Sequence, residues 1–239
     1  GLPAWFAVIP AVLVCVAVGI IVERAAYKPV REKGNNMTAL ITAIAMSLLL
    51  ENLAQAIPAM GPNPRVISDE IFSTAPMSLG GVSVNMAAVI TIVIAAVVMA
   101  ALQIFVQKTK LGRAMRAVSE NKEASTLVGI NVNRTIVTTF AIGSGLAAVA
   151  ALMYCAQYHT VTTTMGSMLG LKAFVAAVMG GIGLIPGAML GGIVVGIIEA
   201  LVTAYISSSL ANAVVFLILI VMLLVKPAGI LGKNVGEKV

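Results

Sequence analysis

Long apolar runs, separated by short polar intervals, constrain the fold of this chain more than any other feature. The first run, residues 4–22, is long enough for a helix rising about 1.5 Å per residue to cross the hydrocarbon core of a bilayer. A helix satisfies its own backbone hydrogen bonds where no water is present, so we expect each run to be helical. The later long runs are residues 37–57, 82–106, 135–158, 187–206 and 210–225.

Composition excludes a soluble domain. Hydrophobic residues make up 60% of the chain and charged residues only 10%, with a mean hydropathy of +1.06. In a soluble chain the net charge of +6 would favour a nucleic-acid partner, but here the charge is confined to short loops beside apolar runs. The aromatic content of 5% offers no stacking platform for bases. We therefore expect an all-α, polytopic bundle in contact with lipid and no nucleic-acid partner.

The longest polar interval, residues 108–134, holds six of the fifteen Lys and Arg residues. Leu111, Met115 and Val118 recur at helical spacing, which predicts an amphipathic helix. Ser119 is the expected N-cap of a second short helix, and Gly129 is expected to close that helix in the left-handed conformation. This pattern predicts a compact helix pair between two membrane spans.

Such a pair is suited to docking another protein. Glu123 supplies a carboxylate for a partner's base, Ala124 permits close approach, and Gly129 turns the chain. The residues expected to make contact are Arg113, Arg116, Glu120, Glu123, Ala124 and Gly129. Two alternatives need no docking partner: the basic residues follow the positive-inside rule, which we favour for Lys108, Lys110 and Lys122, or the stretch lies on anionic lipid.

Charge distribution sets the topology. Thirteen of the fifteen Lys and Arg residues lie in residues 24–33, 108–134 and 226–238, which we place in the cytoplasm. An even number of crossings must then separate these regions, so the short apolar segment 169–185 must itself cross. This gives about seven crossings, one of them short and broken, with a cytoplasmic C-terminus. Pro29 is expected to stop any helix continuing from the first span.

The broken segment is the expected lining of a path. Irregular backbone at membrane depth is tolerated only where protein or a water-filled cavity surrounds it. The residues that break the apolar segment are Gly180, Gly181, Gly183 and Pro186. A new helix is expected to start near Gly187, and the stripe of Gly192, Gly196 and Ala200 is expected to pack against a neighbouring helix.

Three charged residues fall within apolar segments and are candidates for the same path. Glu51 either serves a function or reaches interfacial water at the end of its span. Glu199 is expected in a hydrogen-bonded or pathway position rather than against lipid. Lys172 either meets a substrate carboxylate or an anionic head group, or extends toward the outer surface, which we favour.

No catalytic constellation, metal-ligand spacing or cofactor motif stands out. His159 belongs to no catalytic motif, Cys15 and Cys155 are typical of packing residues, and no P-loop is present in the sequence. We therefore expect no enzyme activity, no metal and no cofactor. The chain begins at Gly1 with its first apolar run starting at once, so we expect its natural N-terminus to be missing.

Four segments resemble the permease subunit of bacterial high-affinity branched-chain amino acid ABC importers. They are ERAAYKPVR at 23–31, LGRAMRAVSENKEASTLVGINVNR at 111–134, GLKAFVAAVMGGIGLIPGAMLGG at 170–192 and KPAGILG at 226–232. Glu123, Ala124 and Ser125, followed by Gly129, also look like the loop through which many ABC permeases contact their ATPases, with Ser125 in place of an alanine and no downstream Leu-Pro.

This resemblance implies that residues 1–239 form one permease domain with residues 108–134 as its coupling loop, in the bacterial inner membrane. The implied partners are a homologous second permease, two cytoplasmic ATP-binding subunits and an external substrate-binding protein. Branched-chain amino acids are the implied cargo, with urea, sugars or other amino acids as alternatives. Two other classes stay open: an ion-coupled secondary transporter using Glu51 and Glu199 as relays, and a channel-like structural component.

Overall fold

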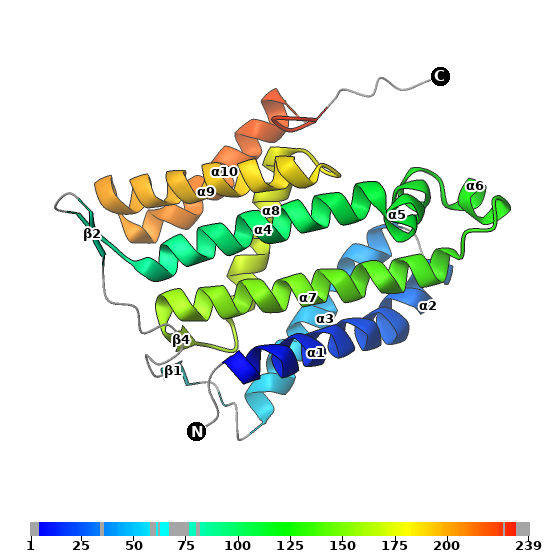
Figure 1. Cartoon of the computed structure of the whole chain (residues 1–239), viewed down its shortest axis with the longest axis horizontal. Helices are drawn as coiled ribbons and strands as arrows, with labels where there is room; N and C mark the ends of the chain where they lie inside the picture. The colour runs from blue at the N-terminus through cyan, green and yellow to red at the C-terminus, as the bar shows by residue number, and fades with distance from the viewer. Residues whose placement is uncertain are drawn as a thin grey trace. The chain divides into compact units, whose positions relative to one another are not determined.

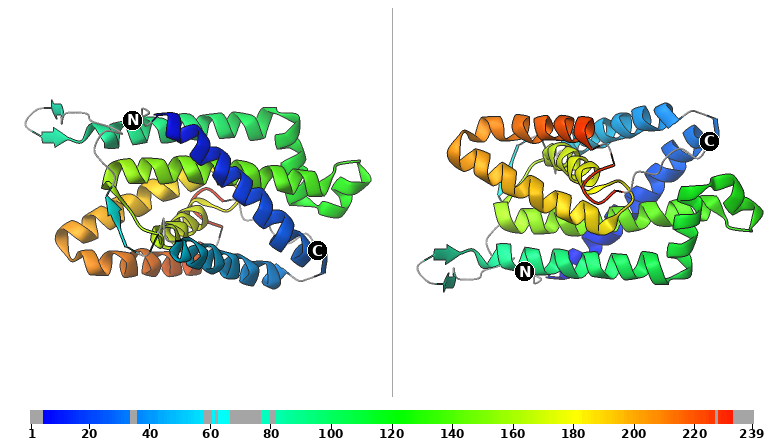
Figure 2. Two further views of the ribbon diagram at one scale, coloured as in Figure 1. Left: turned by 90° about the horizontal axis from the view of Figure 1, so that it is seen from below. Right: turned by 90° about the horizontal axis from the view of Figure 1, so that it is seen from above.

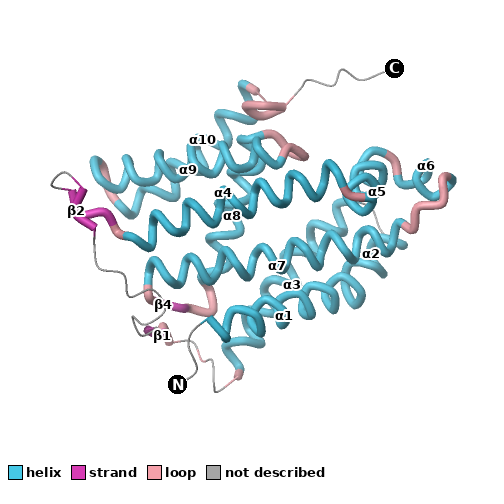
Figure 3. The backbone as a smooth tube through the Cα atoms, viewed as in Figure 1, coloured by secondary structure: helices cyan, strands magenta, loops and turns pink. Residues whose placement is uncertain are grey.

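The computed structural model describes residues 5–33, 36–57, 61, 63–66, 77–79, 82–226 and 228–232. Helices dominate this described part, with four short strands between them (Figure 3). Five helices in it have the length and composition to cross a membrane, and two shorter apolar helices cover 41–56 and 165–180. The prediction of a polytopic helical protein is confirmed, and the crossing of the two shorter helices stays a prediction.

The elements follow the apolar runs (Figure 1). The helices before the central polar interval are α1 (Trp5–Val22), the π-helix η1 (Glu23–Tyr27), α2 (Lys28–Lys33), α3 (Asn36–Ala56) and α4 (Met86–Lys108). The later helices are α5 (Lys110–Glu120), α6 (Lys122–Leu127), α7 (Val132–Tyr158), α8 (Met165–Gly180), α9 (Ile185–Tyr205) and α10 (Ser208–Val225). The chain divides into two compact units, residues 1–97 with 104–163, and residues 98–103 with 164–239.

In the first unit, α1 crosses α7 in close contact (Figure 2). Small residues allow this approach: an added Cβ at Gly19 would lie 2.0 Å from Ser144 Oγ, and one at Gly145 would lie 3.3 Å from a methyl group of Val16. Gly19 and Gly145 therefore permit close contact between the two helices.

The helix does not stop at Pro29, contrary to the sequence prediction. The chain stays helical from α1 through η1 into α2. The Lys28 N–H donates to the carbonyl oxygen of Glu23, one residue further back than in an α-helix. This wider turn precedes Pro29, which then occupies the first turn of α2, where a missing N–H costs little.

Four short strands form two antiparallel pairs within the described residues. Strand β1 (Arg65–Val66) pairs with β4 (Thr160–Val161), and β2 (Met77–Leu79) pairs with β3 (Val82–Val84), both antiparallel. Most of the rest of residues 61–81 lies outside the described residues. His159 joins α7 to β4 in the left-handed conformation, with φ of 53°, which ends the helix.

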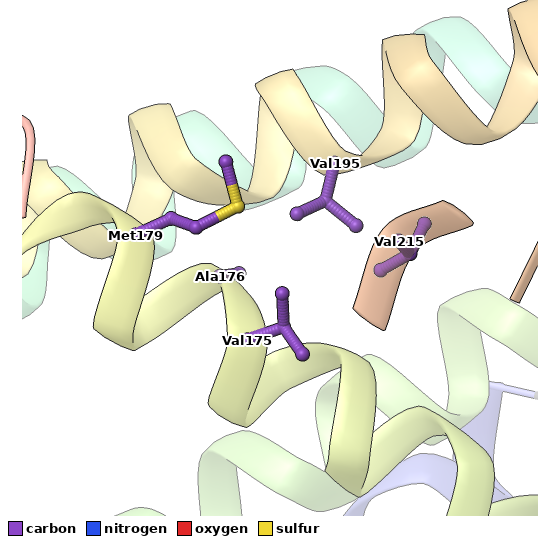
Figure 4. Packing of buried hydrophobic residues seen from close by; sticks show 5 residues of the cluster. All are labelled: Val175, Ala176, Met179, Val195 and Val215. Carbon is purple, nitrogen blue, oxygen red and sulfur yellow. The ribbon is translucent and has the colours of Figure 1, made fainter. Parts of the chain in front are cut away.

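The second unit is a bundle of α8, α9 and α10. Its buried core contains Val175, Ala176 and Met179 from α8, Val195 from α9 and Val215 from α10, whose side chains meet between the three helices (Figure 4). Close contact between α8 and α9 depends on glycine: a Cβ on Gly191 would lie 2.0 Å from the Ala176 carbonyl oxygen.

The predicted packing stripe was largely wrong. A Cβ on Gly196 would meet nothing within 4 Å, and one on Gly192 would only touch the Ala176 methyl group at 3.9 Å. The helices instead meet through Gly180, Gly187 and Gly191. Spacing alone identifies several possible stripes on a glycine-rich helix and does not indicate which one faces the neighbour.

This arrangement predicts unequal effects of two alanine substitutions in α9. Gly191→Ala forces backbone atoms apart and should destabilise the unit by about 1–3 kcal/mol. Gly196→Ala, the matched control, enters open space and should leave stability unchanged or slightly raised. Thermal unfolding of both variants in one detergent checks this expectation, and equal melting temperatures would contradict the packing.

Candidate functional site

The break between α8 and α9 is a well-satisfied turn rather than a frayed end. Gly181 and Gly183 have φ of 110° and 92°, which residues with a Cβ rarely adopt. The Gly181 N–H donates to carbonyl oxygens of α8, and the Leu184 N–H donates to the Gly181 carbonyl at 3.2 Å. Pro186 lies in the first turn of α9, which begins at Ile185, close to the predicted start near Gly187.

The segment that follows α10 closes this turn. The Ile230 N–H donates to the Met179 carbonyl at 2.8 Å, and the Leu231 N–H donates to the Gly180 carbonyl at 3.3 Å. Carbonyl groups at the end of a helix have no partner within that helix. Residues 228–232 therefore provide partners that α8 lacks, and the end of α10 lies at the same end of this unit as the turn.

Lys172 and Glu199 form an ion pair between α8 and α9, with 2.5 Å between Nζ and Oε1. The preferred prediction for Lys172, extension toward the outer surface, was wrong because a carboxylate on the neighbouring helix lies within reach. Lys172 lies about 12 Å along α8 from Gly180, well inside the helix. Their side chains are 22% and 34% exposed, so the pair lies on an accessible face of this unit.

Glu51 is not part of this pair. It lies in α3, one to two turns before that helix ends at Ala56, and is partly exposed. It belongs to the first compact unit, whereas Lys172 and Glu199 belong to the second. The structure therefore brings into contact Lys172 and Glu199, which are two of the three charged residues predicted to line a path.

The central polar interval forms two helices, as predicted, but with a different cap. Helix α5 continues through Ser119 to Glu120, and Asn121 caps α6 by accepting from the Ala124 N–H at 2.9 Å. An Asn side chain accepts this bond as well as a Ser hydroxyl does, so the capping pattern fitted two positions. Gly129 has φ of 85° and closes α6, as predicted.

The docking residues predicted on this loop are all exposed. They are Arg113, Arg116, Glu120, Glu123, Ala124 and Gly129. Val118 and Ser125 are buried, and the Ser125 hydroxyl donates to the Asn121 carbonyl oxygen at 2.7 Å. The sequence analysis missed Leu127 and Val128, which are 89% and 81% exposed. Both follow Ala124 at helical spacing, so the sequence pattern could have placed them on the same face as this predicted contact residue.

A second cluster fastens the start of α7 to the end of the first helical segment. Arg31 donates to Glu23 Oε1 at 3.0 Å and to Asn133 Oδ1 at 2.9 Å. The Glu23 side chain is fully buried, whereas that of Arg31 is 20% exposed. Asn133 lies near the end of the polar interval 108–134, in the first turn of α7, so this guanidinium joins the start of α7 to η1 and α2. The sequence analysis missed the cluster because Arg31 and Asn133 are 102 residues apart.

An apolar cavity of about 440 Å³ lies between α1, α3 and α7 in the first unit. Its lining is mostly apolar, as at Val18 and Phe140. The polar exceptions are Cys15, Tyr27, Ser47 and Ser144. A cavity of this lining suits a hydrocarbon group rather than the charged ends of an amino acid.

The helix pair α5–α6 forms an exposed, charged elbow between apolar spans, and an ion pair joins the two apolar helices α8 and α9. Together these features define a polytopic membrane protein of the transporter class. The chain belongs to the family described as branched-chain amino acid transport system / permease component, whose sequence model matches residues 1–225. Members of this family are permease components of multi-subunit transport systems. No solved structure is significantly similar to the chain.

Two relatives cover most of the chain. It is 39% identical over 236 residues to the high-affinity branched-chain amino acid transport system permease protein BraD of Pseudomonas aeruginosa, covering 95% of this chain and 74% of the relative. It is 42% identical over 240 residues to the corresponding protein LivH of Salmonella typhimurium, covering 97% and 75%. The xylose transport system permease protein XylH of Escherichia coli is 34% identical over 90 residues, covering only 35% and 23%.

The buried cluster predicts a strong effect of one charge removal. Arg31→Met leaves the Glu23 carboxylate buried without its counter-charge and should cost about 3–5 kcal/mol of unfolding free energy. The double variant Glu23→Gln, Arg31→Met removes both charges and should recover much of that loss. Arg113→Met, an exposed control, should change little. Denaturant unfolding in micelles measures all three, and a double variant no better than Arg31→Met would contradict this interpretation.

Proposed function

We propose that this chain carries branched-chain amino acids across the bacterial inner membrane as one permease of an ABC importer. The names of BraD and LivH, which match nearly the whole chain, support this cargo, and the ion pair between Lys172 and Glu199 is the structural observation that carries the proposal. The partners are a second, homologous permease, two ATP-binding subunits and an external binding protein that delivers the amino acid.

An amino acid presents one charge of each sign to a membrane path. Removing either charge from water is costly unless a counter-charge is present. Lys172 offers an ammonium for the substrate carboxylate, and Glu199 offers a carboxylate for the substrate ammonium. The substrate would exchange one internal ion pair for two external ones, so no unpaired charge remains. The pair thus suits a zwitterion with an apolar side chain better than it suits xylose, which has no charge.

The exposure of the pair supports a second permease on the same face. Side chains that are 22% and 34% exposed to hydrocarbon would lose hydration without gaining partners. A facing protein surface or a water-filled path between two permeases avoids this cost. The broken turn around Gly181 and Gly183 lies at the end of the same two helices, where irregular backbone also needs shelter from lipid.

The α5–α6 elbow is the proposed contact for the ATP-binding subunits. Leu127 and Val128 present apolar side chains beside the Glu123 carboxylate and the small Ala124. An exposed apolar tip rimmed by charge is typical of a protein contact. Arg31 joins the return point of the elbow to α2, so motion of the elbow would reach the first spans as movement of a rigid body.

The charged pair predicts loss of transport without loss of assembly. Glu199→Gln and Lys172→Met should each lower ATP-driven uptake of leucine by proteoliposomes of the full complex by at least about tenfold. Arg65→Gln, an exposed control outside the elbow that also loses one positive charge, should transport normally. Uptake unchanged in both pair variants would exclude the pair from the path, and gradient-driven uptake without ATP would favour the secondary-transporter alternative.

The elbow predicts a separate defect. Leu127→Asp places a charge in the proposed apolar contact and should reduce co-purification of the ATP-binding subunits and the uptake that they drive. Thr126→Asp adds the same charge to a neighbouring exposed residue and should have a much smaller effect. Affinity capture of the complex from detergent extracts measures both variants. An equal loss in both would show that the apolar tip is not the contact.

A further inference from the structure

A second cavity in the first unit, of about 420 Å³, has a different character from the apolar one. Its walls come from the end of the first helical segment and from the start of α7. The lining residues are Glu23, Arg24, Lys28, Asn133, Arg134, Val137 and Thr138. Neither the path nor the elbow uses this cavity.

The cavity lies where apolar sequence gives way to polar sequence on both of its walls. Glu23 is the first charged residue after the apolar run of α1, and Arg134 is the last one before the apolar run of α7. Both helices have the length and composition to span a membrane. The cavity is therefore at the level of the lipid head groups, with Val137 on its apolar side.

Its charges do not balance within the described residues. Arg24, Lys28 and Arg134 are exposed, and no ion pair to another described side chain uses any of them. Arg31 already neutralises Glu23 through Oε1. The three remaining cations call for an anion in or beside the cavity.

The Glu23 carboxylate adds a second requirement. Its Oε2 is buried and accepts no hydrogen bond from the described residues, and Glu23 forms part of the cavity wall. Buried polar atoms without a partner are rare and costly. An ionised carboxylate oxygen can only accept, so a simple phosphate would satisfy the cations and leave Oε2 without a donor. The complementary ligand carries an anionic group and a hydrogen-bond donor a few bonds apart.

We propose that this cavity binds the head group of phosphatidylethanolamine. Its phosphate lies among Arg24, Lys28 and Arg134, and its primary ammonium donates to Glu23 Oε2. The head group has no net charge, and its ammonium forms a charge-assisted bond that is stronger than one from a hydroxyl. Its acyl chains extend along the apolar helices on the hydrocarbon side. The bound lipid bridges η1 and α7 next to the cluster formed by Arg31.

Three lipids with identical acyl chains test the donor and the charge separately. The delipidated complex, with its ATP-binding subunits, is titrated with phosphatidylethanolamine, phosphatidylcholine or phosphatidylglycerol, and bound lipid is counted by native mass spectrometry. Phosphatidylcholine keeps the phosphate and the positive charge but has no N–H donor. We expect phosphatidylethanolamine to bind about tenfold more tightly than phosphatidylcholine.

Two double variants test whether the lipid binds in this cavity. Arg24→Gln with Arg134→Gln should lower the affinity for phosphatidylethanolamine about tenfold or more. Lys108→Gln with Lys110→Gln removes the same charge outside the cavity and should leave that affinity unchanged. If the first variant does not fold, the lipid comparison on the unmodified complex still decides. Equal binding of phosphatidylethanolamine and phosphatidylcholine, preference for phosphatidylglycerol, or equal losses in both variants would overturn the proposal.

Discussion

The pairing of opposite charges where water is scarce is the interaction on which the described structure depends. Lys172 meets Glu199 between two apolar helices, and Arg31 meets Glu23 where the first apolar run ends. Each pair removes an isolated charge that lipid or protein interior would not tolerate. The first pair supplies the proposed contacts for a zwitterion. The second fixes the point at which the polar interval 108–134 gives way to the apolar run of α7.

Hydrocarbon makes the helices of such a chain predictable. Each long apolar run became a helix with ends close to the expected ones, because a lipid-exposed backbone must satisfy its own hydrogen bonds. The errors arose at the ends of helices, where several local solutions compete. A π-turn let the helix continue past Pro29, and Asn121 capped α6 in place of Ser119. Residue patterns indicate that an end is near, but the backbone geometry selects which group closes it.

The candidate sites were less predictable because they depend on contacts between distant residues. Lys172 and Glu199 were both recognised as unusual, but nothing in the sequence indicated that they face each other across α8 and α9. The link from Arg31 to Asn133 spans 102 residues and has no local pattern. Leu127 was overlooked for a different reason. An apolar residue is ordinary in a membrane protein, and only its exposure in the structure identifies it as a candidate contact.

The hydrogen bonds by which residues 228–232 close the α8–α9 turn have a consequence for the biosynthesis of the protein. The Met179 and Gly180 carbonyls receive their partners from Ile230 and Leu231, which leave the ribosome about fifty residues later. Until then the hairpin enters the bilayer with those polar groups open to water at its tip. The nascent protein therefore completes the α8–α9 turn only after α10 and the segment that follows it have been made.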